Sequence, residues 1–141
     1  SKLNEDKEQG ATYHDTLKGL LSVSDVLSIC CPASKETIDM INKDTLEFLP
    51  KGAIVTNVAR GDIVDDDAMI DALERRKVYA VGLDVYKNEP NLNPGYLNHK
   101  SAFILPHLGS ATKDTRTAMA NLAIDNLDEF FKTGNCKNKV N

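Results

Sequence analysis

The sequence lacks the features that mark several large classes of protein. No stretch approaches the roughly 20 consecutive apolar residues of a membrane-spanning helix, and residues 1–8 are too polar for the apolar core of a targeting signal. Basic residues form no stripe of the kind that phosphate backbones require, and the formal net charge is -4. These absences argue against a membrane protein and against a nucleic-acid partner, and they predict a cytoplasmic location.

The cysteine spacing of zinc and redox motifs is also missing. The three cysteines are Cys30, Cys31 and Cys136, and no two of them are separated by two residues. The pattern predicts free thiols, with neither a disulfide nor a metal site. Because Cys30 and Cys31 are neighbours at the end of an apolar run, we expect them to be buried as small apolar groups.

What the sequence does contain is an alternation of short apolar runs and helical segments. Its 141 residues are 41% hydrophobic and 27% charged, which is typical of one globular domain. The runs at 26–30, 53–57, 79–84 and 102–105 have the length and composition of buried parallel strands. The alternation predicts an α/β fold with a partial doubly wound parallel sheet.

Charged and capping residues indicate where the helices begin and end. Asp15 is expected to cap a short helix, and another helix is expected over 42–48. The acids at 65–67 and the bases at 75–77 suit the two ends of a helix dipole. The last helix is predicted from about Thr112 to Phe131, with Gly134 as its stop. Its apolar stripe is expected to be buried and comprises Met119, Leu122, Ala123, Leu127, Phe130 and Phe131.

Four strands account for only half of a dinucleotide-binding sheet. The glycine fingerprint G-x-G-x-x-G, which forms the pyrophosphate cradle in such sheets, does not occur in these residues. A half sheet would leave one edge and an apolar flank uncovered. The interpretations that remain are a fragment, a truncated gene product, or a chain completed by partners.

Three segments place chemically active side chains directly after apolar runs. Residues 57–62 contain Arg60, residues 84–90 contain Glu89, and residues 106–110 contain His107. Parallel strands end on the same edge of a sheet, so we expect these three side chains to meet there. An arginine, a carboxylate and an imidazole together can bind an organic anion and move a proton, which predicts an enzyme acting on a small carboxylic acid.

Each of these residues also has a simpler interpretation. Arg60 is alternatively a surface arginine, Glu89 a solvated loop acid, and His107 a structural histidine. His14 and His99 are interpreted as structural, because neither follows a strand end with a suitable carboxylate.

Five short segments, in order along the chain, carry a resemblance to a known family. They are residues 24–26, Pro32 with 36–37, residues 57–61, residues 82–86 with 89–90, and residues 106–112. From Ser24 onward the sequence resembles the second half of the nucleotide-binding domain of the D-isomer-specific 2-hydroxyacid dehydrogenases, and especially the glyoxylate and hydroxypyruvate reductases. The resemblance implies that residues 1–141 are the C-terminal portion of a Rossmann-type NAD(P)-binding domain with a long final helix. The N-terminal substrate domain and the glycine loop are absent from these residues.

The resemblance also implies roles for individual residues. Hydride would pass between NAD or NADP and a small 2-oxo or 2-hydroxy acid. Arg60 would bind the substrate carboxylate, His107 would protonate the carbonyl oxygen, and Glu89 would pair with His107. Asp84 would hold the nicotinamide carboxamide. The cofactor-contacting set implied in this way is Cys31, Pro32, Thr37, Val58, Ala59, Arg60, Asp84, His107 and Gly109.

Further expectations concern assembly and activity. The resemblance implies a homodimer for the intact enzyme, whereas we expect little or no activity from the 141 residues by themselves. A non-catalytic nucleotide-binding or regulatory module, or an inactive fragment, is the alternative that the missing glycine loop favours. Formate oxidation on the same scaffold is disfavoured, because the relatives that perform it replace the glutamate that stands here as Glu89.

Overall fold

The chain divides into two compact units, residues 1–106 and residues 107–141. A computed structural model describes residues 9–140.

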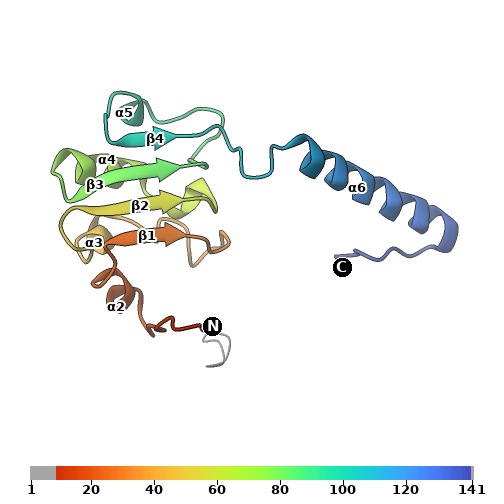
Figure 1. Ribbon diagram of the computed structural model, residues 1–141, viewed down its shortest axis with the longest axis horizontal. Coiled ribbons are helices and arrows are strands. Elements are labelled where there is room, and N and C mark those ends of the chain that lie inside the picture. The colour runs from red at the N-terminus through yellow and green to blue at the C-terminus, as the bar shows by residue number, and fades with distance from the viewer. Residues whose placement is uncertain (1–8, 141) are drawn as a thin grey trace. The chain divides into compact units, whose positions relative to one another are not determined.

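The first unit is built on a four-stranded, all-parallel sheet (Figure 1). Its strands are β1 (Val26–Ile29), β2 (Ala53–Asn57), β3 (Val78–Leu83) and β4 (Ala102–Ile104), and they lie side by side in sequence order. Each of the four predicted strands is therefore confirmed to within one residue at either end. The parallel arrangement brings all four carboxyl ends to one edge of the sheet.

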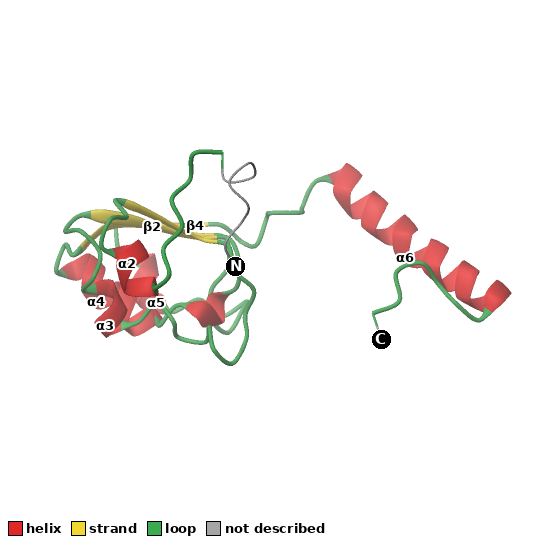
Figure 2. Ribbon diagram, turned by 90° about the horizontal axis from the view of Figure 1, so that it is seen from below, coloured by secondary structure: helices red, strands yellow, loops and turns green. Residues whose placement is uncertain are grey.

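The helices of this unit lie on one face of the sheet, as the edge-on view in Figure 2 shows. They are α2 (Leu17–Leu21), α3 (Lys43–Leu46), α4 (Asp66–Glu74) and α5 (Pro94–Leu97), with a 3-10 turn, η1, at Gly61–Ile63. Buried strand residues such as Leu27, Val55 and Val81 alternate with more exposed ones, and they form the core together with apolar helix residues. The observed fold is thus the predicted α/β arrangement.

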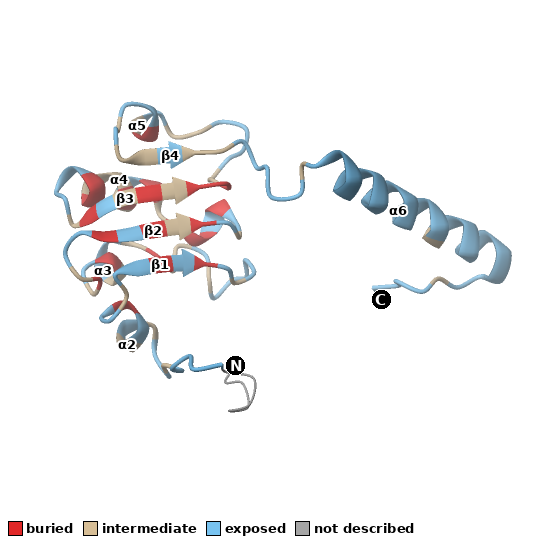
Figure 3. Ribbon diagram, viewed as in Figure 1, coloured by how far each residue is buried: buried red, intermediate tan, exposed pale blue. Residues whose placement is uncertain are grey.

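The opposite face of the sheet carries exposed apolar side chains. Val26 is 62% exposed, Tyr79 67% and Phe103 66%, and Ile54 is also exposed (Figure 3). Parallel sheets normally have both faces covered. The apolar flank predicted for a half sheet is therefore present in the part of the chain that the structure describes.

Local capping explains most of the helix boundaries. The Asp65 side chain accepts a hydrogen bond from the Ala68 N–H at the start of α4, as the acid run predicts. The cap of α2 is Thr16 rather than Asp15, because the Thr16 hydroxyl accepts from the Gly19 N–H at 3.1 Å. The helix expected over 42–48 is shorter than predicted, spanning α3 after its Asn42 cap.

The second unit contains one long helix, α6 (Lys113–Thr133). Thr112 caps its start, and Gly134 ends it in the left-handed conformation with φ 74°, as predicted. The expectation that its apolar stripe is buried is wrong for this structure, since no residue of α6 is buried (Figure 3). Residues 107–140 form no second element against which the stripe could pack.

Candidate functional site

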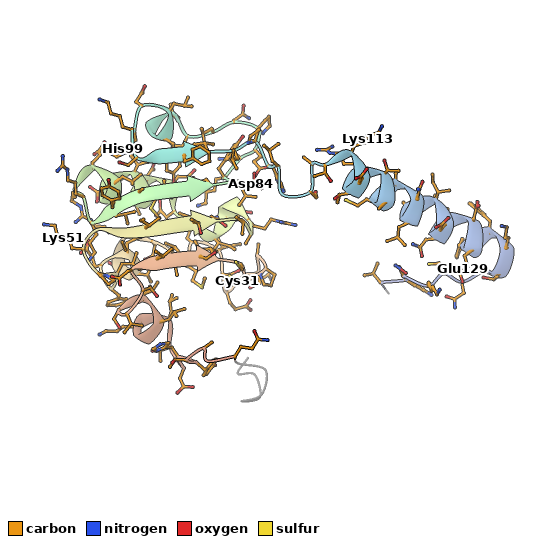
Figure 4. The ribbon with its side chains drawn as sticks, in the orientation of Figure 1. Cys31, Lys51, Asp84, His99, Lys113 and Glu129 are labelled. Carbon is orange, nitrogen blue, oxygen red and sulfur yellow. The ribbon has the colours of Figure 1, made fainter. Side chains whose placement is uncertain are left out.

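The candidate site lies at the carboxyl edge of the sheet. Figure 4 shows Cys31 and Asp84 where β1 and β3 end, whereas Lys51 and His99 lie at the opposite, amino edge. The loops that follow β1, β2 and β3 therefore share one edge, and they carry Cys31, Arg60 and Glu89 respectively. This places the predicted site residues of the first unit at one end of the sheet.

The loop that carries Arg60 is shaped by a buried asparagine. Asn57, the last residue of β2, is fully buried, and its Nδ2 donates to the Arg60 carbonyl at 2.8 Å while its Oδ1 accepts from the Ala59 N–H at 3.0 Å. Both hydrogen bonds close the same short turn. The turn fixes the backbone from which the Arg60 side chain projects.

Arg60 itself is exposed at the mouth of this turn. Its Nη1 donates to the Ala59 carbonyl at 2.6 Å, which uses one of the five N–H groups of the guanidinium. The remaining donors suit bidentate binding of a carboxylate.

An open cleft of about 500 Å³ lies between the loops after β1 and β2. Five residues of the predicted cofactor-contacting set line it, namely Cys31, Pro32, Val58, Ala59 and Arg60. Cys30 and Ala33 complete the lining. The cleft thus combines small apolar surfaces with one cation.

The two adjacent cysteines do not behave as expected. All three cysteines are free, but Cys30 is exposed and Cys31 half-buried, so the prediction that both are buried is wrong. β1 ends at the buried Ile29, and Cys30 lies on the side of the exposed Ser28, whose Oγ is 3.5 Å from the Cys30 Sγ.

Thr37 lies beside a neighbouring hollow rather than in the main cleft. Its hydroxyl donates to the Pro32 carbonyl at 3.0 Å and accepts from the Ser34 N–H at 2.7 Å. These bonds close the loop after β1 and shape the wall that carries Pro32. The hollow also contains Cys30, Cys31 and Met40, so the two cavities adjoin at the cysteines.

The loop after β3 carries Asp84 and Glu89. Asp84 is buried, and its N–H donates to the Asn57 carbonyl at 3.0 Å, which continues the sheet pairing to its edge. The Glu89 Oε1 accepts from the Tyr86 N–H at 3.1 Å. The carboxylate is therefore held in a local turn at the carboxyl edge.

A glycine lets the loops after β2 and β3 touch. A Cβ on Gly61 would lie 2.0 Å from the carbonyl carbon of Tyr86 and 2.4 Å from the Lys87 nitrogen. Only a residue without a side chain allows this approach. Sequence reasoning missed Gly61 and Asn57 as site-shaping residues, although a polar residue ending an apolar run and a glycine directly after an arginine were visible signals.

A buried polar pair lies beneath the same edge. The Tyr96 hydroxyl donates to Asp66 Oδ1 at 3.0 Å, and both residues are buried. Burial raises the pKa of the Asp66 carboxyl, although the Tyr96 hydrogen bond acts in the opposite direction. Burial and the Asp66 charge likewise raise the pKa of the Tyr96 hydroxyl. Asp66 begins α4, so this pair anchors the helix that follows η1.

His107 and Gly109 belong to the second unit. His107 has a φ of 56°, in the left-handed region that non-glycine residues adopt uncommonly, although asparagine, aspartate and histidine are enriched there. Such backbone conformations cluster at functional sites. The meeting of His107 with Arg60 and Glu89 stays a prediction.

The part of the chain that the structure describes holds neither a metal-binding cluster nor a membrane-spanning helix. Within residues 9–140, no three His, Cys, Asp or Glu side chains come together as a metal-binding group. Across the same residues, no helix combines the length and the apolar character needed to cross a membrane.

Comparison with protein families gives a match over most of the chain. Residues 1–109 match the family model of the D-isomer specific 2-hydroxyacid dehydrogenase, NAD binding domain. The chain belongs to this family. The family resemblance found in the five sequence segments is thereby confirmed, together with the Rossmann-type fold class.

Individual relatives agree with this assignment. The chain is 46% identical to a glycerate dehydrogenase of Hyphomicrobium methylovorum over 121 residues, which cover 86% of the chain and 38% of the relative. It superposes on a glyoxylate reductase from Paecilomyes thermophila with a TM-score of 0.89 and 38% identity, covering 99% of the chain and 42% of the structure. An NADPH-dependent glyoxylate/hydroxypyruvate reductase from Sinorhizobium meliloti, solved with NADP and malonate, gives a TM-score of 0.86 and 38% identity over 90% of the chain and 40% of that structure.

The chain spans about two fifths of the length of the relatives that it matches.

Proposed function

We propose that this chain supplies the carboxyl-terminal portion of the nucleotide-binding domain, and the reacting side chains, of an NAD(P)-dependent 2-hydroxyacid dehydrogenase that reduces a small 2-oxo acid such as glyoxylate or hydroxypyruvate. The observation that carries the proposal is the cleft at the carboxyl edge, where Arg60 lies with Pro32, Val58 and Ala59. Ligands of open parallel sheets bind at this edge. The names of the relatives support the choice of substrate class.

Arg60 would bind the substrate carboxylate. Its turn is fixed by the Asn57 side chain, and most of its guanidinium donors are available for a bidentate contact. A guanidinium placed beside the carboxylate also polarises the adjacent carbonyl group, which lowers the barrier to reduction.

His107 would donate the proton that the carbonyl oxygen gains during reduction, and would accept it in the reverse direction. Glu89 would orient the imidazole and stabilise its charged form. The Glu89 carboxylate is already held by the Tyr86 N–H, which keeps one of its oxygens in place.

The cofactor supplies the hydride when it is bound, because no side chain can do so. The residues present fit the part of a nicotinamide nucleotide that reaches this edge. Pro32, Val58 and Ala59 offer a small apolar wall. Asp84 directly follows β3 at the same edge, where its carboxylate would accept hydrogen bonds from the carboxamide.

A non-catalytic nucleotide-binding or regulatory module is the second candidate. The observation that favours it is the absence of a G-x-G-x-x-G motif from these residues. The two candidates differ in one respect, since only the enzyme needs Arg60, Glu89 and His107 to act on a common substrate.

The experiment is a chimera in which this chain replaces the matching segment of the Sinorhizobium meliloti reductase. We expect the chimera to oxidise NADPH in the presence of glyoxylate, measured by the absorbance of the reduced nicotinamide. His107→Ala should lower kcat by about 100-fold or more, the usual contribution of a general acid. Arg60→Met should raise the KM for glyoxylate as well as lower kcat.

His99→Ala is the matched control, because His99 lies at the amino edge and its Nδ1 accepts from the Ser101 N–H. It should leave turnover unchanged. A folded chimera that binds NADPH and turns over equally well with and without His107 would refute the proposal. NADPH binding without any turnover would favour the regulatory module.

Assembly and location belong to the same proposal. We propose that the active form is a homodimer, as the family resemblance implies, and that it is located in the cytoplasm. Sedimentation of the active chimera at increasing concentration tests the assembly, and fractionation of cells that express the protein tests the location.

A further inference from the structure

The loop that carries Glu89 also carries Lys87, whose side chain contacts the loop after β1. Lys87, two residues before Glu89, forms an ion pair through its Nζ with Asp39 Oδ1. Asp39 lies 48 positions earlier in the chain, in the loop after β1. The pair therefore joins two of the loops that border the candidate site.

Asp39 is itself fastened to the segment that follows Arg60. Its N–H donates to the Asp62 carbonyl at 2.8 Å, and the next residue but one, Ile41, donates to the Ile63 carbonyl at 3.0 Å. The Asp65 N–H donates back to the Ile41 carbonyl at 2.9 Å. A ladder of backbone hydrogen bonds thus fixes Asp39 relative to the Arg60 turn.

A backbone contact joins the same loops directly. Gly61 follows Arg60, is buried, and touches the peptide between Tyr86 and Lys87 so closely that a Cβ would overlap it. The Glu89 loop is therefore joined to the Arg60 turn directly by the Gly61 contact, and indirectly through Lys87, Asp39 and the backbone hydrogen bond from Asp39 to Asp62.

The Lys87 side chain is only 26% exposed, and its surroundings are acidic. Burial acts to lower the pKa of Lys87, but the hydrogen bond and charge of Asp39, together with Asp65 and Asp66, outweigh burial and raise it. The lysine is thus kept charged beside three carboxylates from the loop after β1 and the start of α4. Their mutual repulsion would otherwise favour separation of these segments.

We propose that Lys87 is a positioning residue, whose ion pair with Asp39 holds the Glu89 loop in register with the Arg60 turn. This role deepens the proposed function and rests on it. Lys87 acts through Glu89, whose carboxylate accepts the Tyr86 N–H only while residues 86–89 keep their turn.

The test uses the complete 141-residue chain, labelled with 15N, and needs neither cofactor nor substrate. The Tyr86 amide resonance reports its hydrogen bond to Glu89, through its chemical shift, its titration with the carboxylate and its hydrogen exchange. Lys87→Met should increase exchange at Tyr86 by about fivefold, as expected for loss of a partly exposed ion pair, and should weaken the carboxylate-dependent titration of the shift.

Three further variants decide whether the ion pair is responsible. Asp39→Asn should reproduce the effect, and the double variant Asp39→Asn/Lys87→Met should be no worse than either single one, because both remove the same interaction. Lys87→Arg should restore the Tyr86 signature. Lys77→Met is the matched control, since Lys77 pairs with Glu47 at the amino edge and its loss should leave the Tyr86 amide unchanged.

An unchanged Tyr86 amide in a folded Lys87→Met protein would overturn the proposal, as would additive effects in the double variant. If Lys87→Met fails to fold, Asp39→Asn removes the same pair from its more exposed side and decides the question alone. Failure here would leave the proposed reaction standing. Conversely, loss of the reaction's dependence on His107 would leave this result untouched.

Discussion

The two edges of the sheet are both held together by side chains, but in different ways. At the amino edge, Lys77 and Arg75 reach Glu47 and the carbonyl groups near it from partly exposed positions. At the carboxyl edge, the partly exposed Lys87–Asp39 pair is accompanied by the hydrogen bonds of the buried Asn57 side chain and by the close Gly61 contact. We therefore expect the backbone beneath Arg60 and Glu89 to be held more rigidly than the amino edge.

The difference follows from what each edge has to do. Loops before parallel strands only return the chain to the sheet, and exposed ion pairs suffice for that. Loops after the strands carry ligand contacts, which require reacting groups to be held to within a fraction of an ångström. Matched substitutions, one at each edge of the sheet, test whether the two edges differ in rigidity.

The largest difference in lost stability is expected between alanine substitutions at two glycines, Gly61 and Gly52. Gly61→Ala should destabilise the protein by about 3 kcal/mol or more, because its Cβ would overlap backbone atoms that cannot move aside. Gly52→Ala at the amino edge should cost only about 1 kcal/mol, because Gly52 has open space around it and only its φ of 84° resists a side chain. Urea unfolding followed by circular dichroism measures both. Equal losses would mean that the tight contact at Gly61 is not a constraint.

The second contrast is between two asparagines. Asn57→Ala should cost about 2 to 3 kcal/mol, because it removes a fully buried side chain and leaves the Ala59 N–H and the Arg60 carbonyl without their partner. Asn98→Ala should change stability by less than about 0.5 kcal/mol, because Asn98 is exposed before β4. The same unfolding measurement applies. A cost at Asn57 no larger than that at Asn98 would contradict the rigidity assigned to the Arg60 turn.

Sequence patterns predicted the framework well because its determinants are local. The four apolar runs, the Asp65 cap, the start of the last helix near Thr112 and the Gly134 stop each depend on neighbouring residues, and the structure confirms them. The short helix α5 was missed, because four residues provide no periodic signal. Burial of the α6 stripe was predicted wrongly, since a stripe indicates that a helix is amphipathic but does not provide its partner.

The site was only partly predictable for the same reason. Topology alone brings Arg60 and Glu89 to one edge, since every parallel strand ends there. The roles of Asn57, Gly61 and Lys87 depend on which loops touch, and contacts such as Lys87 with Asp39 leave no local signal in the sequence. Residues that hold a site together are therefore harder to find than residues that could react in it.

Carboxylates at the two edges have pKa values shifted in opposite directions. The resulting difference in the pH dependence of stability is the smallest effect expected between the edges. Burial raises the pKa of Asp66 at the carboxyl edge, whereas the hydrogen bond from Arg75 lowers the pKa of Glu47 at the amino edge. With a raised pKa, the folded state binds more protons than the unfolded state. Stability therefore falls as the pH rises from the ordinary aspartate pKa through the raised one. With a lowered pKa, stability is present above the ordinary glutamate pKa and is lost as the pH falls through the lowered one.

Asp66→Asn and Glu47→Gln should therefore respond to pH with opposite signs. At pH 7 Asp66→Asn should be more stable than the parent, because the amide oxygen still accepts from Tyr96 without a buried charge, and this advantage should vanish below the ordinary aspartate pKa. Glu47→Gln should be less stable than the parent at pH 7 and as stable as the parent in strong acid. Added salt should shrink the difference at pH 7, because it screens the ion pair between Glu47 and Arg75. Unfolding free energies from pH 3 to pH 8 give both curves. If both substitutions changed the stability at pH 7 in the same direction, desolvation of Asp66 at the carboxyl edge would not be the dominant effect there.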